Sequence, residues 1–204
     1  MNPLKSIVGT IVSGFVLAII IVLVTKGNHM VAGMSAQSIT IWLHVLFGIT
    51  WIGLLYYFNF VQVPALGEAA GDEGGPGPAG ISKYVAPRAL AWFRWGALGT
   101  WLTGAAFLLH KKQLLNAFML GMNTDPINQY ALTIGVGAWL GTFMLFNVWV
   151  LIWPNQKKVL GMVEASADEV AKAKNVAFLA SRSNTLMSIP MIMSMVGAGH
   201  GWFM

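Results

Sequence analysis

Five long apolar stretches are the feature that most constrains how this chain can fold. A helix needs about 20 mostly apolar residues to cross the hydrocarbon core of a membrane. The stretches cover about residues 7–25, 38–63, 89–109, 129–153 and 184–202. We therefore expect an all-α integral membrane bundle of five transmembrane helices, in which Pro64 ends the second span and Pro154 ends the fourth.

The composition supports a membrane protein and excludes other classes. Of the 204 residues, 56% are hydrophobic and only 9% are charged, whereas soluble domains carry about 25% charged residues. A soluble enzyme, a disordered chain and a nucleic-acid-binding protein are excluded on this ground. The chain has no cysteine, which also excludes disulfides, iron–sulfur clusters and covalently attached c-type haem.

The chain is interpreted as one membrane domain over residues 1–204, with an extra N-terminal span in 1–30 and a four-span bundle in 38–204. Ser166 and Glu169 have the spacing of a capping box. This motif predicts a helix on the membrane surface over about 166–182, which leads into the last span.

Lysine and arginine are distributed unevenly between the two ends of the predicted bundle. One side holds nine of them: Lys5, Lys83, Arg88, Arg94, Lys157, Lys158, Lys172, Lys174 and Arg182. The other side holds three: Lys26, Lys111 and Lys112. Because basic residues concentrate on the cytoplasmic side, we expect the N-terminus inside and the C-terminus outside.

This orientation puts every histidine in the outer half of the bundle: His29, His44, His110 and His200. His29 and His110 are interpreted as interfacial residues. His44 lies inside the second stretch, and an ionisable residue within a span indicates a function. Gly48 lies one turn after His44, and Gly197 lies nearly one turn before His200. A glycine beside each imidazole would leave room for a flat macrocycle between helices.

Three interpretations of His44 and His200 remain open from the residues alone. The simplest is an interhelical hydrogen bond. The second is haem b, with both imidazoles as axial ligands of the iron. The third is a metal ion or a quinone, although zinc and copper usually require three or four ligands.

A separate polar group is predicted at the inner end of the bundle. Its basic residues are Arg88, Arg94, Lys157, Lys158 and Arg182, and its amides are Asn59, Gln62 and Asn147. The simpler interpretation is that the basic residues extend to the lipid headgroups and that the amides hydrogen-bond to one another. The functional interpretation is a binding site for an anion, such as a carboxylate or a deprotonated purine.

Four ordered segments resemble the membrane domain of the bacterial membrane-bound urate hydroxylase (urate oxidase N-terminal domain) family. They are WLHVLFGITWIGLLYYFNFVQVP (Trp42–Pro64), RALAWFRWGALGTWLTG (Arg88–Gly104), IWPNQKKVLG (Ile152–Gly161) and RSNTLMSIPMIMSMVGAGH (Arg182–His200). The resemblance implies a cofactor-dependent oxidase domain that passes electrons to a cytochrome c. By motif position it favours His44 and His200 as cofactor ligands, and Arg94, Asn147 and Arg182 as substrate contacts. Because this chain lacks cysteine, we expect the cytochrome to be a separate partner or to be absent.

Three functions follow as expectations. The first is a haem b-binding electron-transfer protein or subunit that passes electrons toward a c-type cytochrome. The second is a cofactor-free accessory subunit of a larger respiratory or photosynthetic membrane complex. The third is a urate-type purine oxidase domain, and hence an oxidoreductase. In each case we expect a multi-pass protein of the bacterial inner (cytoplasmic) membrane, surrounded by lipid and without a nucleic-acid partner.

Overall fold

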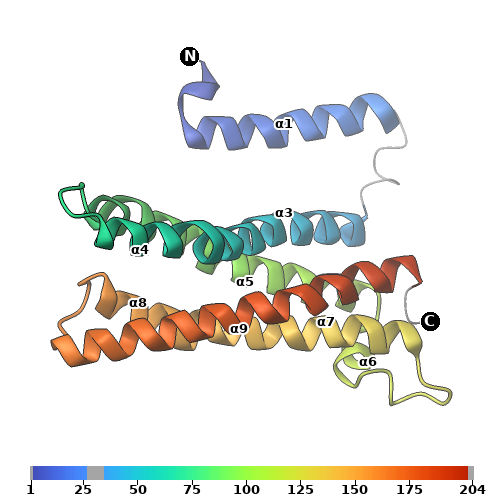
Figure 1. Ribbon diagram of the computed structural model, residues 1–204. Coiled ribbons are helices and arrows are strands. Elements are labelled where there is room, and N and C mark those ends of the chain that lie inside the picture. The colour runs from blue at the N-terminus through green and yellow to red at the C-terminus, as the bar shows by residue number, and fades with distance from the viewer. Residues whose placement is uncertain (1, 27–34, 202–204) are drawn as a thin grey trace. The chain divides into compact units, whose positions relative to one another are not determined.

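The computed structural model describes residues 2–26 and 35–201, and its regular structure there is entirely helical (Figure 1). The chain divides into two compact units, Met1–Ile39 and Thr40–Met204. The first unit contains the short 3-10 turn Pro3–Lys5 and helix α1 (Ile7–Lys26). His29 lies outside the described residues. The all-α class predicted from the sequence is confirmed.

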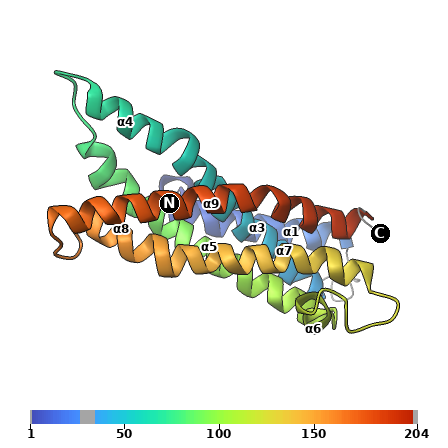
Figure 2. The same ribbon diagram turned by 60° about the horizontal axis from the view of Figure 1, so that its bottom comes forward.

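The α-helices of the second unit are joined by loops of different lengths or directly by π-helical turns. They are α3 (Ala36–Tyr57, which begins in the first unit), α4 (Val63–Gly71), α5 (Ala86–His110), α6 (Leu114–Phe118), α7 (Gln129–Phe146), α8 (Trp153–Val159) and α9 (Ala167–His200). Helix α9 runs back along α7 and α8 (Figure 1). In Figure 2, α4 extends away from the other helices of this unit.

Two prolines that were expected to end spans do not end them. A π-helical turn, η3 (Phe58–Gln62), precedes Pro64, and another, η5 (Asn147–Ile152), precedes Pro154. In a regular α-helix, proline lacks the N–H donor and clashes with the carbonyl four residues earlier. The wider π turn bonds five residues back, so the carbonyls ahead of each proline are shifted and the helix continues. The predicted stops at Pro64 and Pro154 are therefore wrong.

The two helices that continue through these prolines are long enough to cross a membrane. They cover Ala36–Gly71 and Gln129–Val159, and together with Ile7–Thr25 they are the described helices that are both long and apolar enough to cross a membrane. Helix α5 has 25 residues and α9 has 34, but their charged residues lower the mean hydropathy. The count of five spans and the orientation remain predictions.

The predicted surface helix is not a separate element. The structure has one uninterrupted helix, α9, which begins after Ser166 and continues through Pro190 to His200. The buried alanines Ala173, Ala177 and Ala180 lie on its N-terminal half, where α9 packs against α8. Small residues at this spacing allow two helices to approach closely. The segment 166–182 is therefore the start of α9 and not a distinct surface helix.

The capping box at the start of α9 is present as predicted. The Glu169 backbone N–H donates to Ser166 Oγ at 3.3 Å, and the Ser166 backbone N–H donates to Glu169 Oε2 at 2.9 Å. Lys158 of α8 lies 3.3 Å from Glu169 Oε1. The Ser166 backbone hydrogen bond, followed by the Lys158 ammonium, lowers the pKa of Glu169.

This lowered pKa makes the first turn of α9 sensitive to acid. The folded form favours the ionised carboxylate, so its stabilising effect is present above the pKa of an ordinary glutamate, about 4.3. It is lost as the pH falls through the lower folded-state pKa. We expect amide hydrogen-exchange protection at Glu169 and Val170 to fall across this range. The Glu169→Gln variant should show low protection at every pH, and a wild-type profile that stays flat would contradict the prediction.

Hydrogen bonds of the polar side chains Asn184 and Ser194 join α9 to α7 and to the π turn that follows it. Asn184 is fully buried, donates to the Met144 carbonyl at 3.0 Å and accepts from Asn147 Nδ2 at 2.8 Å. Ser194, nearer the C-terminal end of α9, donates to the Thr133 carbonyl and accepts from the Gly137 N–H. In a low-dielectric interior such polar contacts fix the register of two helices.

The Asn184→Leu variant should unfold more easily than the wild type. It leaves the Asn147 amide and the Met144 carbonyl without their partner, at a cost of about 1 kcal/mol in a membrane bundle. The midpoint of thermal unfolding in detergent measures this loss. Asn123→Leu is the matched control because Asn123 is exposed, and an equal loss in both variants would contradict the assignment.

Candidate functional site

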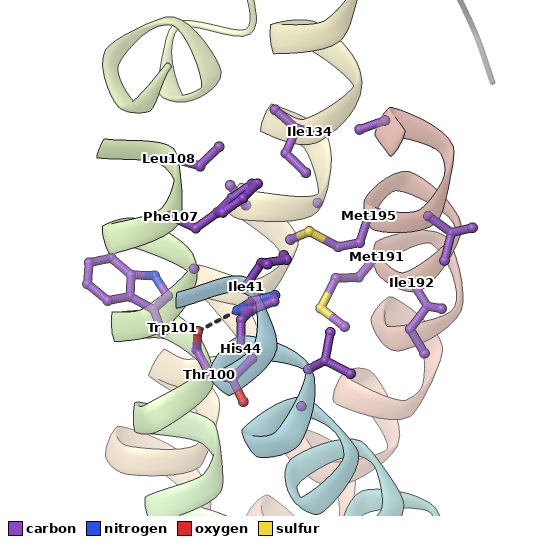
Figure 3. A pocket seen from close by; sticks show the side chains of 18 of the residues that line it. Ile41, His44, Thr100, Trp101, Phe107, Leu108, Ile134, Met191, Ile192 and Met195 are labelled. Carbon is purple, nitrogen blue, oxygen red and sulfur yellow. Dashed lines mark hydrogen bonds between the residues drawn. The ribbon is translucent and has the colours of Figure 1, made fainter. Parts of the chain in front are cut away.

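A cavity of about 930 Å³ lies between α3, α5, α7 and α9. His44 and Gly48 line it from α3, and His200 lines it from the end of α9. Figure 3 shows His44 facing the same space as Met191 and Met195 of α9. Gly197 is buried but does not line the cavity. Three of the four residues predicted to contact a cofactor therefore share one cavity.

A carbonyl of α5 orients the His44 imidazole. His44 Nδ1 lies 2.8 Å from the Thr100 carbonyl oxygen (Figure 3). Because a carbonyl only accepts hydrogen bonds, Nδ1 must carry the proton, and in the neutral ring Nε2 then keeps its lone pair. Gly104 provides the space for the ring, since a Cβ there would lie 2.8 Å from both Cε1 and Nδ1 of His44.

The His200 imidazole has the same hydrogen-bonding arrangement. Its Nδ1 lies 2.8 Å from the Val196 carbonyl oxygen, one turn earlier on α9. The same reasoning assigns the proton to Nδ1 and leaves Nε2 with a lone pair. His200 is exposed, whereas His44 is half-buried. The two imidazoles thus offer equivalent nitrogens from helices that are far apart in sequence.

The register of α3 and α9 brings these two histidines to the same depth. The Tyr56 hydroxyl lies 3.0 Å from Ser188 Oγ, which pairs the two helices at that level. The helices run in opposite directions (Figure 1). His44 lies 12 residues before Tyr56, and His200 lies 12 residues after Ser188. At 1.5 Å per residue, both histidines therefore lie about 18 Å from the Tyr56–Ser188 level.

The remaining wall of the cavity is mainly apolar. Met191 and Met195 stand against Gly141 and Gly137 of α7, with the Met191 sulfur 3.7 Å from the position of a Cβ at Gly141. Trp51 also lines the cavity, and its indole N–H is buried without a partner. No carboxylate belongs to the lining. Within the part of the chain that the structure describes, no three His, Cys, Asp or Glu side chains form a metal-binding cluster.

The residues predicted as substrate contacts do not line this cavity, and each has a different neighbour. The Arg94 guanidinium stacks on Trp153, with Cζ 3.3 Å from the ring centroid. Asn147 donates to Asn184. Arg182 lies over Phe178 at 5.2 Å. The described contacts therefore do not bring Arg94, Asn147 and Arg182 together.

Thr100 and Gly104, the two neighbours of His44 on α5, were not identified from the sequence as parts of a site. Together with Gly96 they form a stripe of small residues, and such stripes usually serve helix packing. The stripe does meet α3, but at Gly104 it receives an imidazole and not backbone. A glycine on one span at the depth of a histidine on another was the signal that could have identified it.

Comparison with known families found a match to the C-terminal part of the chain. Residues 113–204 match the family model described as urate oxidase N-terminal. Over this segment the chain is similar to the urate oxidase N-terminal family. The match confirms the predicted resemblance and covers α6 to α9, including His200; His44 and Arg94 lie outside it. No curated protein and no solved structure matches the chain.

Proposed function

We propose that the chain is a membrane electron-transfer protein or subunit that binds haem b and passes electrons toward a c-type cytochrome. The observation that supports this proposal is the pair of imidazoles on one cavity. Each of His44 and His200 has its Nδ1 hydrogen-bonded to a backbone carbonyl and offers Nε2. Histidines that bind metals usually have their second nitrogen held in this way, because that hydrogen bond sets the tautomer and raises the basicity of the ligand.

The tautomer also favours haem over the other ligands considered for this site. A quinone carbonyl requires a hydrogen-bond donor, whereas neutral His44 would present a lone pair. A zinc or copper ion usually takes three or four ligands, whereas the described residues that line the cavity include His44 and His200 and no carboxylate. Haem supplies four nitrogens itself, so two axial imidazoles complete its coordination.

The residues around the cavity have definite roles in this proposal. His44 and His200 would hold the group, and the Thr100 and Val196 carbonyls would orient the two rings. The apolar lining would exclude water, which is one of the factors that set a haem reduction potential. Haem, when bound, supplies a one-electron iron couple. The proposed location is the bacterial inner membrane.

Titration of the purified full-length protein with haem tests the proposal. We expect a saturable Soret band at one haem per chain, and a low-spin ferric signal in electron paramagnetic resonance. The reduced protein should then be oxidised by a c-type cytochrome in a stopped-flow experiment. Absence of a saturable Soret band would overturn the proposal and favour the cofactor-free accessory subunit.

A purine oxidase is the second candidate, supported by the match of residues 113–204 to the urate oxidase N-terminal family. Membranes that contain the chain and a c-type cytochrome would be supplied with urate. Urate-dependent reduction of the cytochrome, absent from membranes without the chain, is the expected result for this candidate. No reduction above the background would count against it.

A further inference from the structure

Arg94 presents an unpaired positive charge away from the histidine cavity. Its Nε and Nη1 atoms are buried and have no hydrogen-bond partner among the residues that the structure describes. Arginine cannot lose its proton in a protein, so both nitrogens remain charged donors. A buried donor without an acceptor is costly, and more so when it is charged. Arg94 therefore needs a hydrogen-bond acceptor that the described residues do not supply.

A second cation faces the same indole. Arg94 Cζ lies 3.3 Å from the centroid of the Trp153 ring, and Lys157 Nζ lies 5.8 Å from it. The two charged atoms are therefore no more than about 9 Å apart, and like charges at such a separation repel each other. In the described part of the chain neither cation forms an ion pair; the ion pair found there joins Lys158 to Glu169. The protein thus supplies two positive charges and no counter-charge.

Another donor lies close to this pair. The Trp149 ring packs against Trp95, the residue next to Arg94, with centroids 5.4 Å apart. The indole N–H of Trp149 is also buried without a partner. Trp149 belongs to the π turn η5, and π turns occur frequently at functional sites. Among the described residues, Arg94 and Trp149 thus both present buried donors that lack an acceptor.

From these contacts we infer an anion-binding site formed by Arg94, Trp153 and Lys157, with Trp149 beside it. The ligand is an oxyanion, either the phosphate of an anionic lipid headgroup or a free phosphate or carboxylate. An oxyanion supplies the missing acceptors and offsets the repulsion between the two cations. This site does not depend on the proposed haem function, because none of its four residues lines the histidine cavity.

Thermal unfolding of the full-length protein in neutral detergent tests this site. One arm adds short-chain phosphatidylglycerol, with phosphatidylcholine as the neutral lipid. The other arm adds inorganic phosphate, with chloride at equal ionic strength. We expect the anion to raise the midpoint in at least one arm, and the arm that responds identifies the source of the ligand.

Substitutions then localise the effect. Arg94→Gln and Lys157→Gln should each weaken the apparent affinity for the responding anion about tenfold or more, as expected when a charged hydrogen bond is lost. Arg182→Gln is the matched control, because Arg182 contacts Phe178 instead. If Arg94→Gln does not fold, the Lys157→Gln variant decides the question. No response in the wild type, or an equal loss in Arg182→Gln, would overturn the inference.

Discussion

The His44→Ala variant is expected to lose the Soret band of the haem-loaded protein while keeping its helical content. His44 Nε2 is one of the two proposed ligands, and among the described residues that line the cavity the other histidine is His200. A methyl group at this position cannot bind iron, whereas the Thr100 carbonyl would still accept a hydrogen bond from Thr103 Oγ1. Absorption spectra at saturating haem, with circular dichroism as the check on folding, measure the result.

His110→Ala is the control for this experiment. His110 ends α5 and does not line the cavity, so its removal should leave haem binding unchanged. His200→Ala is expected to leave a five-coordinate haem with a shifted Soret band and a high-spin ferric signal. A His44→Ala protein that binds haem with the wild-type spectrum would show that the ligand lies elsewhere.

The second large effect is expected from Gly104→Ala. A methyl group at Gly104 would lie 2.8 Å from Cε1 and Nδ1 of His44, which is closer than atoms of these types can pack. The imidazole must move, and its hydrogen bond to Thr100 is then lost. Because loss of such an orienting partner typically lowers metal affinity by about 10- to 100-fold, haem affinity should fall by that amount.

Gly53→Ala provides the matched comparison. Gly53 also lines the cavity, but a Cβ there would meet no atom within 4 Å. Haem titrations of the two variants should therefore differ, with Gly53→Ala close to the wild type. Equal affinities in the two variants would show that the His44 orientation does not control binding.

The fold class could be predicted from the sequence because apolar length is a strong signal. The expected stretch 89–109 corresponds to α5, Ala86–His110, and the capping box at Ser166 marks the start of α9. The ends at Pro64 and Pro154 could not be predicted. Whether a proline stops a helix depends on whether the preceding turn widens, which the residue alone does not reveal.

The candidate site was predictable in part for a related reason. His44 is conspicuous as an ionisable residue in an apolar stretch, and its depth relative to His200 follows from simple helix geometry. The neighbours of Arg94 depend on the rotation of each helix about its axis. Trp153 lies beyond the π turn η5, and that turn changes which face the following residues present. The sequence grouped Arg94 with Lys157 and Arg182. In the structure Arg94 and Lys157 lie over the same Trp153 ring, whereas Arg182 lies over Phe178.

The π turns also determine how far the helices reach. The helix Ala36–Gly71 has 36 residues, which is about 54 Å at 1.5 Å per residue, against a hydrocarbon core about 30 Å thick. Even when strongly tilted, such a rod is too long to be immersed entirely in lipid tails. The helix Gln129–Val159 has 31 residues and α9 has 34, so both also exceed this thickness at 1.5 Å per residue. In a membrane the ends of these helices would lie outside the hydrocarbon core, in contact with headgroups and water, and the polar, pH-sensitive start of α9 is suited to that environment.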